Sequence, residues 1–556
     1  MLNKSTLAAA FLCGGCLLAA CSRGPSAPQA GMESFQANAL IEHIRTLASD
    51  KFEGRAPGSL GEQLTVSYLQ TQFREMGLEP GNPDGTFLQK VPLVGITADP
   101  AMILTLARGR ALQARFGTDF VAWTKRVVEA TSLDAEMVFV GYGVQAPEFQ
   151  WDDFKGADVK GKVIVVLVND PPVPDEKVFG GKAMTYYGRW TYKFEKAAEL
   201  GAAGAFIIHE TGPAGYPWEV VRGSWSGEQF DLVTPDKNMK RAAVEGWITA
   251  AQAEAVFKLA GKDFPAAKEA AVSRAFKPIP LGVRARLAFR NKLRTVDSLN
   301  VIAKLSGSDE KLRNEYVIYN AHWDHLGKSP AAAGDRIFNG ARDNASGTAA
   351  LLELARAFTR LRTPPRRSLL FLAVTAEEQG LLGSHHYAEN PLHPLAQTAA
   401  VINLDLVNVL GRTRDLVSIG LGSSTLDETI EAVARELGRT IKPDPEPEKG
   451  YFYRSDHFNF AKQGVPAFYP NSGIEFIGKP EGWGLQMREK YTREDYHKPS
   501  DEVKDYWDLS GMVDDCRLFF LVGYRLANEA KVPEWKPGAE FKATREASLR
   551  QAGKLD

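Results

Sequence analysis

From about residue 299 onward, short apolar runs alternate with longer amphipathic segments. The apolar runs predict buried strands, which in a parallel sheet are apolar on both faces; they lie at 316–321, 368–374 and 400–404. The amphipathic segments have helical spacing; they lie at 345–360, 380–389 and 424–437. Strands that alternate with helices predict an α/β fold, with a mainly parallel mixed sheet flanked by helices on both faces.

The part of the chain before residue 299 has a different pattern. Residues 35–80 are predicted to be helical, because apolar side chains recur at helical spacing from Val66 to Met76 and Gly77 can end the helix. Further on, strands are predicted at 137–143, 162–168 and 205–208, with a helix at 192–200. Dense glycine and proline between 170 and 235 indicates a separate compact module with long loops.

Length and composition limit the number of domains, the class of protein and its partners. A chain of 556 residues should form several domains, or one large domain with an insertion. Its 44% hydrophobic and 24% charged residues are typical of a globular protein. The net charge of −1 favours neither nucleic acid nor an anionic membrane as a partner.

The N-terminus is predicted to be a targeting segment. Lys4 is followed by an apolar run that closes with Leu18-Ala19-Ala20-Cys21, which resembles the lipobox of bacterial lipoproteins. We expect a signal peptide at 1–20, a lipid on Cys21 and a polar tether at 21–33. The protein would then lie on the periplasmic side of a bacterial membrane, the outer one by expectation. The alternative is an ordinary secretory signal with a chance cysteine.

The remaining cysteines fit this interpretation. Cys13 and Cys16 would be removed with the signal. Only Cys516 then remains besides the acylated cysteine, within a helix-like stretch at 509–529, where we expect it to pack in the core.

Five residues of metal-ligand type lie in separate segments, at or just beyond the predicted strands or in loops. They are His322, Asp343, Glu378, Asp405 and His497. Two imidazoles and three carboxylates suit Zn²⁺ or a similar divalent ion. One tetrahedral zinc needs only four ligands, so five indicate two metals that share a carboxylate.

The local sequence around these residues supports the two-metal hypothesis at some positions and allows another role at others. Asp324 could accept a hydrogen bond from the far ring nitrogen of His322 and so orient it, while His325 is expected to support the site or to pack. Asp343 could equally cap the helix that follows it. The pair Glu377-Glu378 directly follows a buried strand, where a charge is costly unless it is paired or metal-bound. One of the two acids could ligate while the other acts as general base.

Ser455, Asp456 and His457 are consecutive and invite a serine-hydrolase interpretation. Catalytic triads, however, assemble from residues distant in sequence, and Ser455 lacks a GxSxG turn. The loops around 451–458 and 470–490 could instead shape a substrate pocket. The candidates for substrate binding there are Tyr453, Arg454 and Asp456, and Arg454 could hold a substrate carboxylate; aromatic residues in these loops could equally be packing.

With these motifs together, the chain resembles the di-zinc aminopeptidases of metallopeptidase family twenty-eight. The segments that carry the resemblance are "AHWDH", "GARDNASG", "TAEEQGLLGS", "NLDL" and "YHKPSD". The stretch from about 120 to 285, which includes "KAAELGAAGAFIIH", resembles a protease-associated domain inserted into the peptidase domain. The resemblance implies a zinc exopeptidase fold with peptide substrates and two Zn²⁺ per chain. The oligomeric state is left open.

The resemblance also implies a role for each residue. His322 and Asp405 would complete one zinc site, Glu378 and His497 the other, and Asp343 would bridge them. Glu377 would be the general base, Asp324 would orient His322, and Tyr496 would stabilise the oxyanion. One departure from the family is Arg342, where many relatives carry an acid.

The implied domain organisation follows the chain. The segments are a signal at 1–20, a tether at 21–33, the first peptidase segment at 34–119, the inserted protease-associated domain at 120–285, the catalytic domain at 286–535 and a tail at 536–556. The leading hypothesis is a lipid-anchored aminopeptidase. The alternatives are a single-zinc enzyme like glutaminyl cyclase, a dipeptidase or glutamate carboxypeptidase-like enzyme, and a binding ectodomain without catalysis.

Overall fold

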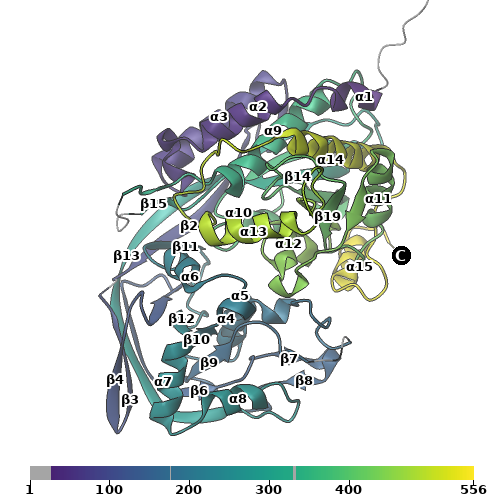
Figure 1. Ribbon diagram of the computed structural model, residues 1–556. Helices are drawn as coiled ribbons and strands as arrows, with labels where there is room; N and C mark the ends of the chain where they lie inside the picture. Colours follow the sequence, from purple (N-terminus) through teal and green to yellow (C-terminus); the bar gives the residue numbers. More distant parts are fainter. Residues whose placement is uncertain (1–26, 100, 174, 176, 330–333, 556) are drawn as a thin grey trace, which may run out of the picture.

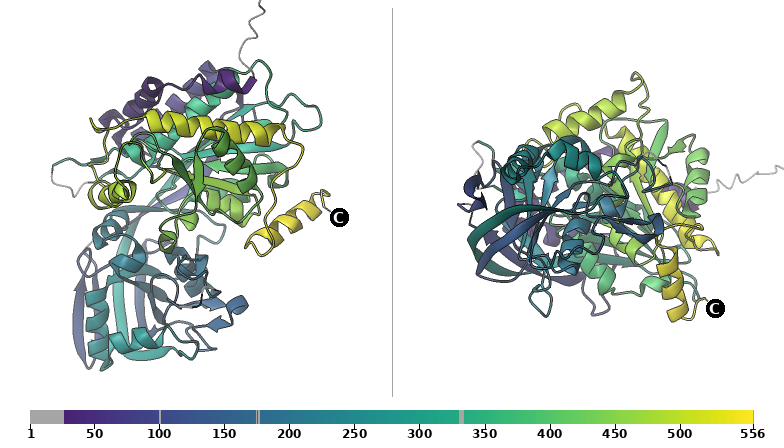
Figure 2. Two further views of the ribbon diagram at one scale, coloured as in Figure 1. Left: turned by 45° about the vertical axis from the view of Figure 1, so that its right-hand side comes forward. Right: turned by 90° about the horizontal axis from the view of Figure 1, so that it is seen from below.

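The protein forms two lobes, seen one above the other in Figure 1 and in the left view of Figure 2. The computed structural model describes residues 27–99, 101–173, 175, 177–329 and 334–555; the predicted signal and Cys21 lie outside them. We call residues 27–98 and 291–555 the large lobe, and residues 101–290 the small lobe. The predicted sites lie in the large lobe.

The large lobe is built on a mixed sheet with a parallel centre. Strands β17, β14, β18 and β21 are parallel neighbours in that order, and β13 and β19 pair antiparallel at the two sides. The bounds are β13 (Ile279–Leu305), β14 (Tyr316–His322), β17 (Ser368–Val374), β18 (Thr398–Asn403), β19 (Asp415–Ile419), β20 (Thr440–Lys442) and β21 (Ala467–Asn471). The predicted α/β architecture is confirmed.

Helices cover both faces of this sheet, because successive side chains of each strand point to opposite sides. One face packs under α2, α3, α9, α11 and α14, and the other under α10 and α12 (Figure 1). The bounds are α2 (Ala37–Leu47), α3 (Leu60–Glu75), α9 (Ser346–Thr359), α10 (Leu382–Glu389), α11 (Leu426–Glu436), α12 (His457–Lys462) and α14 (Ser510–Asn528). Cys516 is fully buried in α14, as expected.

The small lobe has its own sheet, with a parallel core of β6, β9, β10 and β12. Its strands are β3 (Ile103–Arg108), β4 (Arg110–Arg115), β5 (Phe120–Trp123), β6 (Ala130–Phe139), β9 (Val163–Leu167), β10 (Gly204–His209) and β12 (Val244–Thr249). One face packs against α7 (Ala250–Ala260) and α8 (Phe264–Ala270), and the other against α4 (Trp190–Glu199) and α6 (Trp218–Ser224). Because β3 and β4 pair within this sheet, the small lobe begins before the predicted insertion at 120.

One long strand, β13, runs through both lobes. The first half of β13 pairs with β3 and β6 of the small lobe, and the second half pairs with β2 (Leu88–Ala98) and β17 of the large lobe. The short strand β11 (Glu228–Leu232) extends the same ribbon by pairing with β2. The two lobes are therefore connected through continuous backbone pairing, rather than through a loose linker.

Two predicted elements differ from the structure. The predicted strand at 137–143 ends at Phe139, because Gly141 and Gly143 adopt positive φ angles of 59° and 62° that break the strand. The stretch 470–490, predicted as a loop, contains the start of α13 (Trp483–Glu494).

The C-terminal stretch 536–555, predicted as a tail, contains α15 (Lys542–Gln551). Its Arg545 donates hydrogen bonds to the carbonyl oxygens of Leu395 and Thr398, at 2.9 and 2.8 Å. Within the described part of the chain, we find no helix with the length and apolar character needed to cross a bilayer.

Candidate metal centre

The five predicted ligands meet at the carboxyl edge of the parallel strands. His322 is the last residue of β14, while Glu378 and Asp405 follow β17 and β18. Asp343 lies in the irregular segment before α9, and His497 lies in the loop after α13. Strand ends on one edge of a parallel sheet converge, which is why ligands so far apart in sequence come together.

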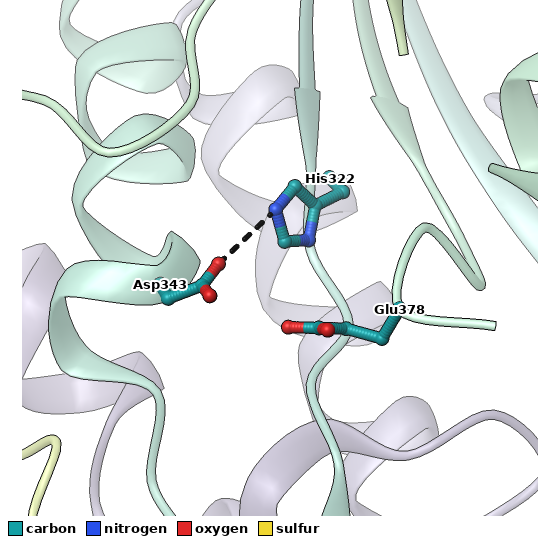
Figure 3. A group of neighbouring side chains, drawn as sticks. All are labelled: His322, Asp343 and Glu378. Carbon is teal, nitrogen blue, oxygen red and sulfur yellow. Dashed lines mark ion pairs between the residues drawn. The ribbon is translucent and has the colours of Figure 1, made fainter. Parts of the chain in front are cut away.

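The ligands divide into two groups around Asp343. One oxygen of Asp343 lies 3.5 Å from Nε2 of His322, and the other lies 3.4 Å from Nε2 of His497. Asp405 Oδ1 lies 3.6 Å from the same nitrogen of His322, and Glu378 Oε2 lies 2.9 Å from that of His497. Figure 3 shows His322 facing Asp343, with the Glu378 carboxylate nearby. Each oxygen of Asp343 therefore faces a different histidine.

The donor set fits divalent cations. The Nε2 atom of His322 is buried and has no hydrogen-bond partner among the described residues, although carboxylates surround it. Donor atoms of His322, Asp343 and Glu378 lie within 4.8 Å of one another, as do those of His322, Glu377 and Asp405. Several carboxylates buried together are unfavourable unless positive charge is added. Nitrogen and oxygen donors at this spacing suit Zn²⁺.

The buried carboxylates shift the pKa values of their neighbours. Burial lowers the pKa of the His497 imidazole, but the charge of Glu378 and hydrogen bonds to Asp343 and Glu378 outweigh burial and raise the pKa to about 10. Burial is also the largest cause at Glu377, where it raises the pKa of the carboxyl well above its usual range; Glu378 adds to this rise and His322 opposes it. A buried carboxyl with a raised pKa is suited to accept a proton.

Asp324 holds the turn that presents the two acids. Its carboxylate accepts hydrogen bonds from the backbone N–H groups of Glu377 and Glu378, at 3.0 and 3.3 Å. Its Oδ1 lies 3.6 Å from Nδ1 of His322, while its backbone oxygen lies 3.3 Å from that nitrogen. The expected contact with His322 is therefore made by the backbone oxygen, and the carboxylate positions Glu377 and Glu378.

The remaining predicted residues flank the centre. The ring of Tyr496 stacks on that of His497, with 3.9 Å between centroids. Tyr496 lines a pocket with Glu377, Tyr453 and Arg454. Asp456 does not line this pocket: it is fully buried, and its Oδ1 accepts a hydrogen bond from the hydroxyl of Ser384 at 2.6 Å.

The sequence Ser455-Asp456-His457 does not form a triad. The hydroxyl of Ser455 donates to Oδ2 of Asp405 at 2.6 Å. Both ring nitrogens of His457 are buried without a partner among the described residues, and burial lowers the pKa of this imidazole to about 3. Ser455 therefore supports a predicted metal ligand.

Two further residues near the centre, His325 and Asp501, make contacts that the sequence did not predict. Nδ1 of His325 lies 2.6 Å from Oε1 of Glu378. The carboxylate of Asp501 accepts the backbone N–H groups of Arg342 and Asp343, at 3.2 and 3.0 Å, and fixes the loop that carries the bridge. The motif "YHKPSD" contains Asp501, but its spacing says nothing about what the carboxylate contacts.

Arg342, the noted departure from the family pattern, is directed toward α13. Its guanidinium carbon lies 4.4 Å from the ring centroid of Tyr491. The hydroxyl of Tyr491 donates to Asp501 at 3.1 Å. Arg342 thus packs behind the loop of the bridging residue.

Comparison with known proteins gives similarities over this same region. Residues 300–515 match the model of Peptidase family M28. A "Probable zinc metalloprotease" of Pyrenophora tritici-repentis is 34% identical over 244 residues, which cover 39% of this chain and 53% of that protein. "Leupeptin-inactivating enzyme 1" of Streptomyces exfoliatus is 26% identical over 254 residues, covering 45% and 52%. The chain thus spans about half the length of these curated relatives.

The fold is shared with a solved structure. The aminopeptidase from Aneurinibacillus sp. strain AM-1 aligns with 91% of this chain and 97% of its own, at a TM-score of 0.55 and 21% identity. The segment that matches family M28 contains all five predicted ligands and Glu377. The chain therefore combines an aminopeptidase-like fold with a region similar in sequence to M28 peptidases.

Proposed function

We propose that this protein is a zinc-dependent aminopeptidase that uses two zinc ions to remove N-terminal residues from peptides. The similarities to family M28 and to zinc metallopeptidases support this class of enzyme. The observation that carries the two-metal proposal is Asp343, whose two oxygens each face a different histidine. A single-zinc enzyme has no need of that arrangement.

In this proposal, His322 and Asp405 would hold one zinc, Glu378 and His497 would hold the other, and Asp343 would be shared by both. The two ions would supply Lewis-acid chemistry, polarising the scissile carbonyl and making a water more acidic. Glu377 accepts the proton of the attacking water and returns it to the leaving amine. The backbone hydrogen bond from Glu377 to Asp324 keeps this carboxyl in place during both transfers.

The other residues act on the substrate or on the ligands. Tyr496, whose ring stacks on that of His497, would donate a hydrogen bond to the substrate oxygen as its charge develops. The carboxylates around the centre favour a free α-ammonium group, which restricts cleavage to the first peptide bond. Ser455 fixes the orientation of Asp405.

The proposal is tested by metal content together with cleavage specificity. We expect about two zinc ions per chain by elemental analysis, and hydrolysis of peptides with a free N-terminus but not of N-acetylated ones. Equal rates on free and N-acetylated peptides would exclude an aminopeptidase. About one zinc per active chain would favour an enzyme of the glutaminyl cyclase type, and a zinc-loaded protein that hydrolyses no peptide would favour a binding ectodomain.

We also propose that the protein is anchored by lipid at Cys21 to the periplasmic side of a bacterial membrane. The sequence Leu18-Ala19-Ala20-Cys21 supports this, although it lies outside the described residues. Expression with labelled palmitate should label the wild type but not Cys21→Ser. Equal labelling of the two would refute the anchor.

A further inference from the structure

An unpaired arginine lies in the pocket beside the metal centre. Arg189 directly precedes α4 of the small lobe and is only 7% exposed. Its Nε has no hydrogen-bond partner, and its side chain forms no ion pair, among the residues that the structure describes. Its guanidinium carbon lies 5.9 Å from the centroid of the Trp190 ring. A buried charge without a partner is unfavourable, so the position calls for an anion.

A second arginine of the same pocket comes from the large lobe. Arg454 donates one hydrogen bond, to the carbonyl oxygen of Ala214 at 2.8 Å, and its Nε is likewise buried without a partner among the described residues. Its guanidinium lies over the rings of Tyr216 and Tyr451. After burial, the charge of Arg454 is the next largest cause that lowers the pKa of Arg189, to about 10. The two cations therefore lie close enough to repel each other.

Three other buried arginines find most of their partners within the fold. Arg55 donates to four carbonyl oxygens, Arg367 pairs with Glu315, and Arg439 pairs with Asp515. The pocket carboxylate of Glu195, six residues after Arg189, is already hydrogen-bonded to the hydroxyl of Tyr186 at 2.6 Å. Among the described residues, neither Arg189 nor Arg454 has a carboxylate partner.

The pocket carries both acidic and basic side chains. It is lined by Glu377, Tyr496 and His497 of the metal centre and also by Arg189 and Arg454. Besides the larger effect of burial, the charges of Asp343 and of Arg454 act in opposite directions on the pKa of the Tyr496 hydroxyl, which Asp343 raises and Arg454 lowers. A peptide with an ammonium group at one end and a carboxylate further along would match both kinds of charge.

We propose that Arg189 and Arg454 form a subsite for a carboxylate of the peptide substrate. The inference rests on the proposed peptidase function and names its substrate class. Paired guanidinium groups bind a carboxylate through charge-assisted hydrogen bonds. The carboxylate is either the C-terminus of a dipeptide or an acidic side chain of a longer peptide, and the enzyme would bind its substrate with residues from both lobes.

The first test compares three substrates that share an N-terminal alanine: Ala-Ala, its amide Ala-Ala-NH₂ and the acidic amide Ala-Asp-NH₂. We expect kcat/KM for at least one carboxylate-bearing substrate to exceed that for Ala-Ala-NH₂ by about 10-fold to 100-fold, mainly through KM. Preference for Ala-Ala indicates a C-terminal carboxylate, and preference for Ala-Asp-NH₂ an acidic side chain. Arg189→Met should abolish the preference, whereas Lys462→Met, which removes an exposed charge from the same pocket, should retain it.

The second test needs no turnover. N-acetylglycine should raise the thermal denaturation midpoint of the zinc-loaded wild type, and N-acetylglycinamide should not. The rise should be lost in Arg189→Met and in Arg454→Met, whereas binding of the acid at the metals alone would persist in both. A persistent rise, or equal kcat/KM for all three substrates, would overturn the subsite. A wild type that shows the Arg189-dependent rise but cleaves nothing would overturn the peptidase proposal and leave the subsite standing.

Discussion

The two lobes are both built on parallel strands, yet they treat polar groups at the strand ends in opposite ways. In the small lobe, Asp170 follows β9 and accepts hydrogen bonds from the N–H and hydroxyl of Thr185, at 2.6 and 2.9 Å. His209, at the end of β10, lies 3.0 Å from the carbonyl oxygen of Tyr216. In the large lobe, His322 ends β14 with an unpartnered nitrogen that faces carboxylates. The same architecture thus carries the candidate site in the lobe where polar groups converge at the strand ends without being satisfied.

The largest expected effect is at Asp343, the proposed bridge of the metal centre. Asp343→Asn should reduce zinc content below two per chain and lower kcat/KM by about ten-thousandfold, because in the proposed arrangement both ions would lose a shared anionic ligand. Elemental analysis and kinetics measure this. The control Asp170→Asn alters a buried aspartate of the small lobe, and it should retain both zinc ions. Full zinc occupancy with normal activity in Asp343→Asn would contradict the bridge.

Glu377→Gln should keep both zinc ions and lower kcat by about a thousandfold, since an amide cannot accept the proton. The neighbouring change Glu378→Gln should instead lose zinc. The two variants thus distinguish the acid that transfers the proton from the acid that binds zinc. If the two variants lost zinc equally, Glu377 would have to be counted among the ligands.

Ser455→Ala should lower zinc affinity by about 10-fold to 100-fold, because the orienting hydrogen bond to Asp405 is lost. Ser384→Ala is the matched control. It removes a buried hydroxyl that donates at the same 2.6 Å distance to Asp456, a carboxylate outside the predicted ligand set. Competition with a zinc chelator measures both variants, and an equal change in the two would refute the specific role of Ser455.

The smallest expected effect concerns a contact between the two lobes. The hydroxyl of Ser224, on α6 of the small lobe, lies 3.3 Å from Nδ1 of His497. Ser224→Ala should weaken zinc binding by up to about tenfold, since it frees the far nitrogen of a ligand. Ser226→Ala, two residues further along, should have no effect. An unchanged zinc affinity in Ser224→Ala would show that the small lobe supplies pocket walls but does not orient the ligands.

Much of the large lobe could be predicted from sequence because its strands are continuously apolar. The strand predicted at 368–374 matches β17, and those at 316–321 and 400–404 lie within two residues of β14 and β18 at each end. The long strand β13 was missed, although its buried residues Val283, Ala285, Leu287 and Phe289 alternate with exposed ones, as in a half-buried strand. Charged residues between them obscured the apolar signal.

The candidate site was predictable in its ligands but not in their support. The ligands follow apolar strands, and that context is visible in sequence. Ser455 and Asp501 act through contacts with residues 50 and 158 positions away, and no local pattern encodes such contacts. Arg189 is similar: only the fold shows that this arginine is buried without a partner.

Strand β13 has a consequence for any attempt to engineer the protein. It runs for 27 residues and pairs with both sheets, with its side chains alternating between buried and exposed over most of its length. Inserting a single residue near Arg290 would turn the following side chains to the opposite face and shift the two lobes against each other by one step. A graft of a foreign small lobe would therefore have to preserve strand length and phase, much as an exon exchange must preserve the reading frame.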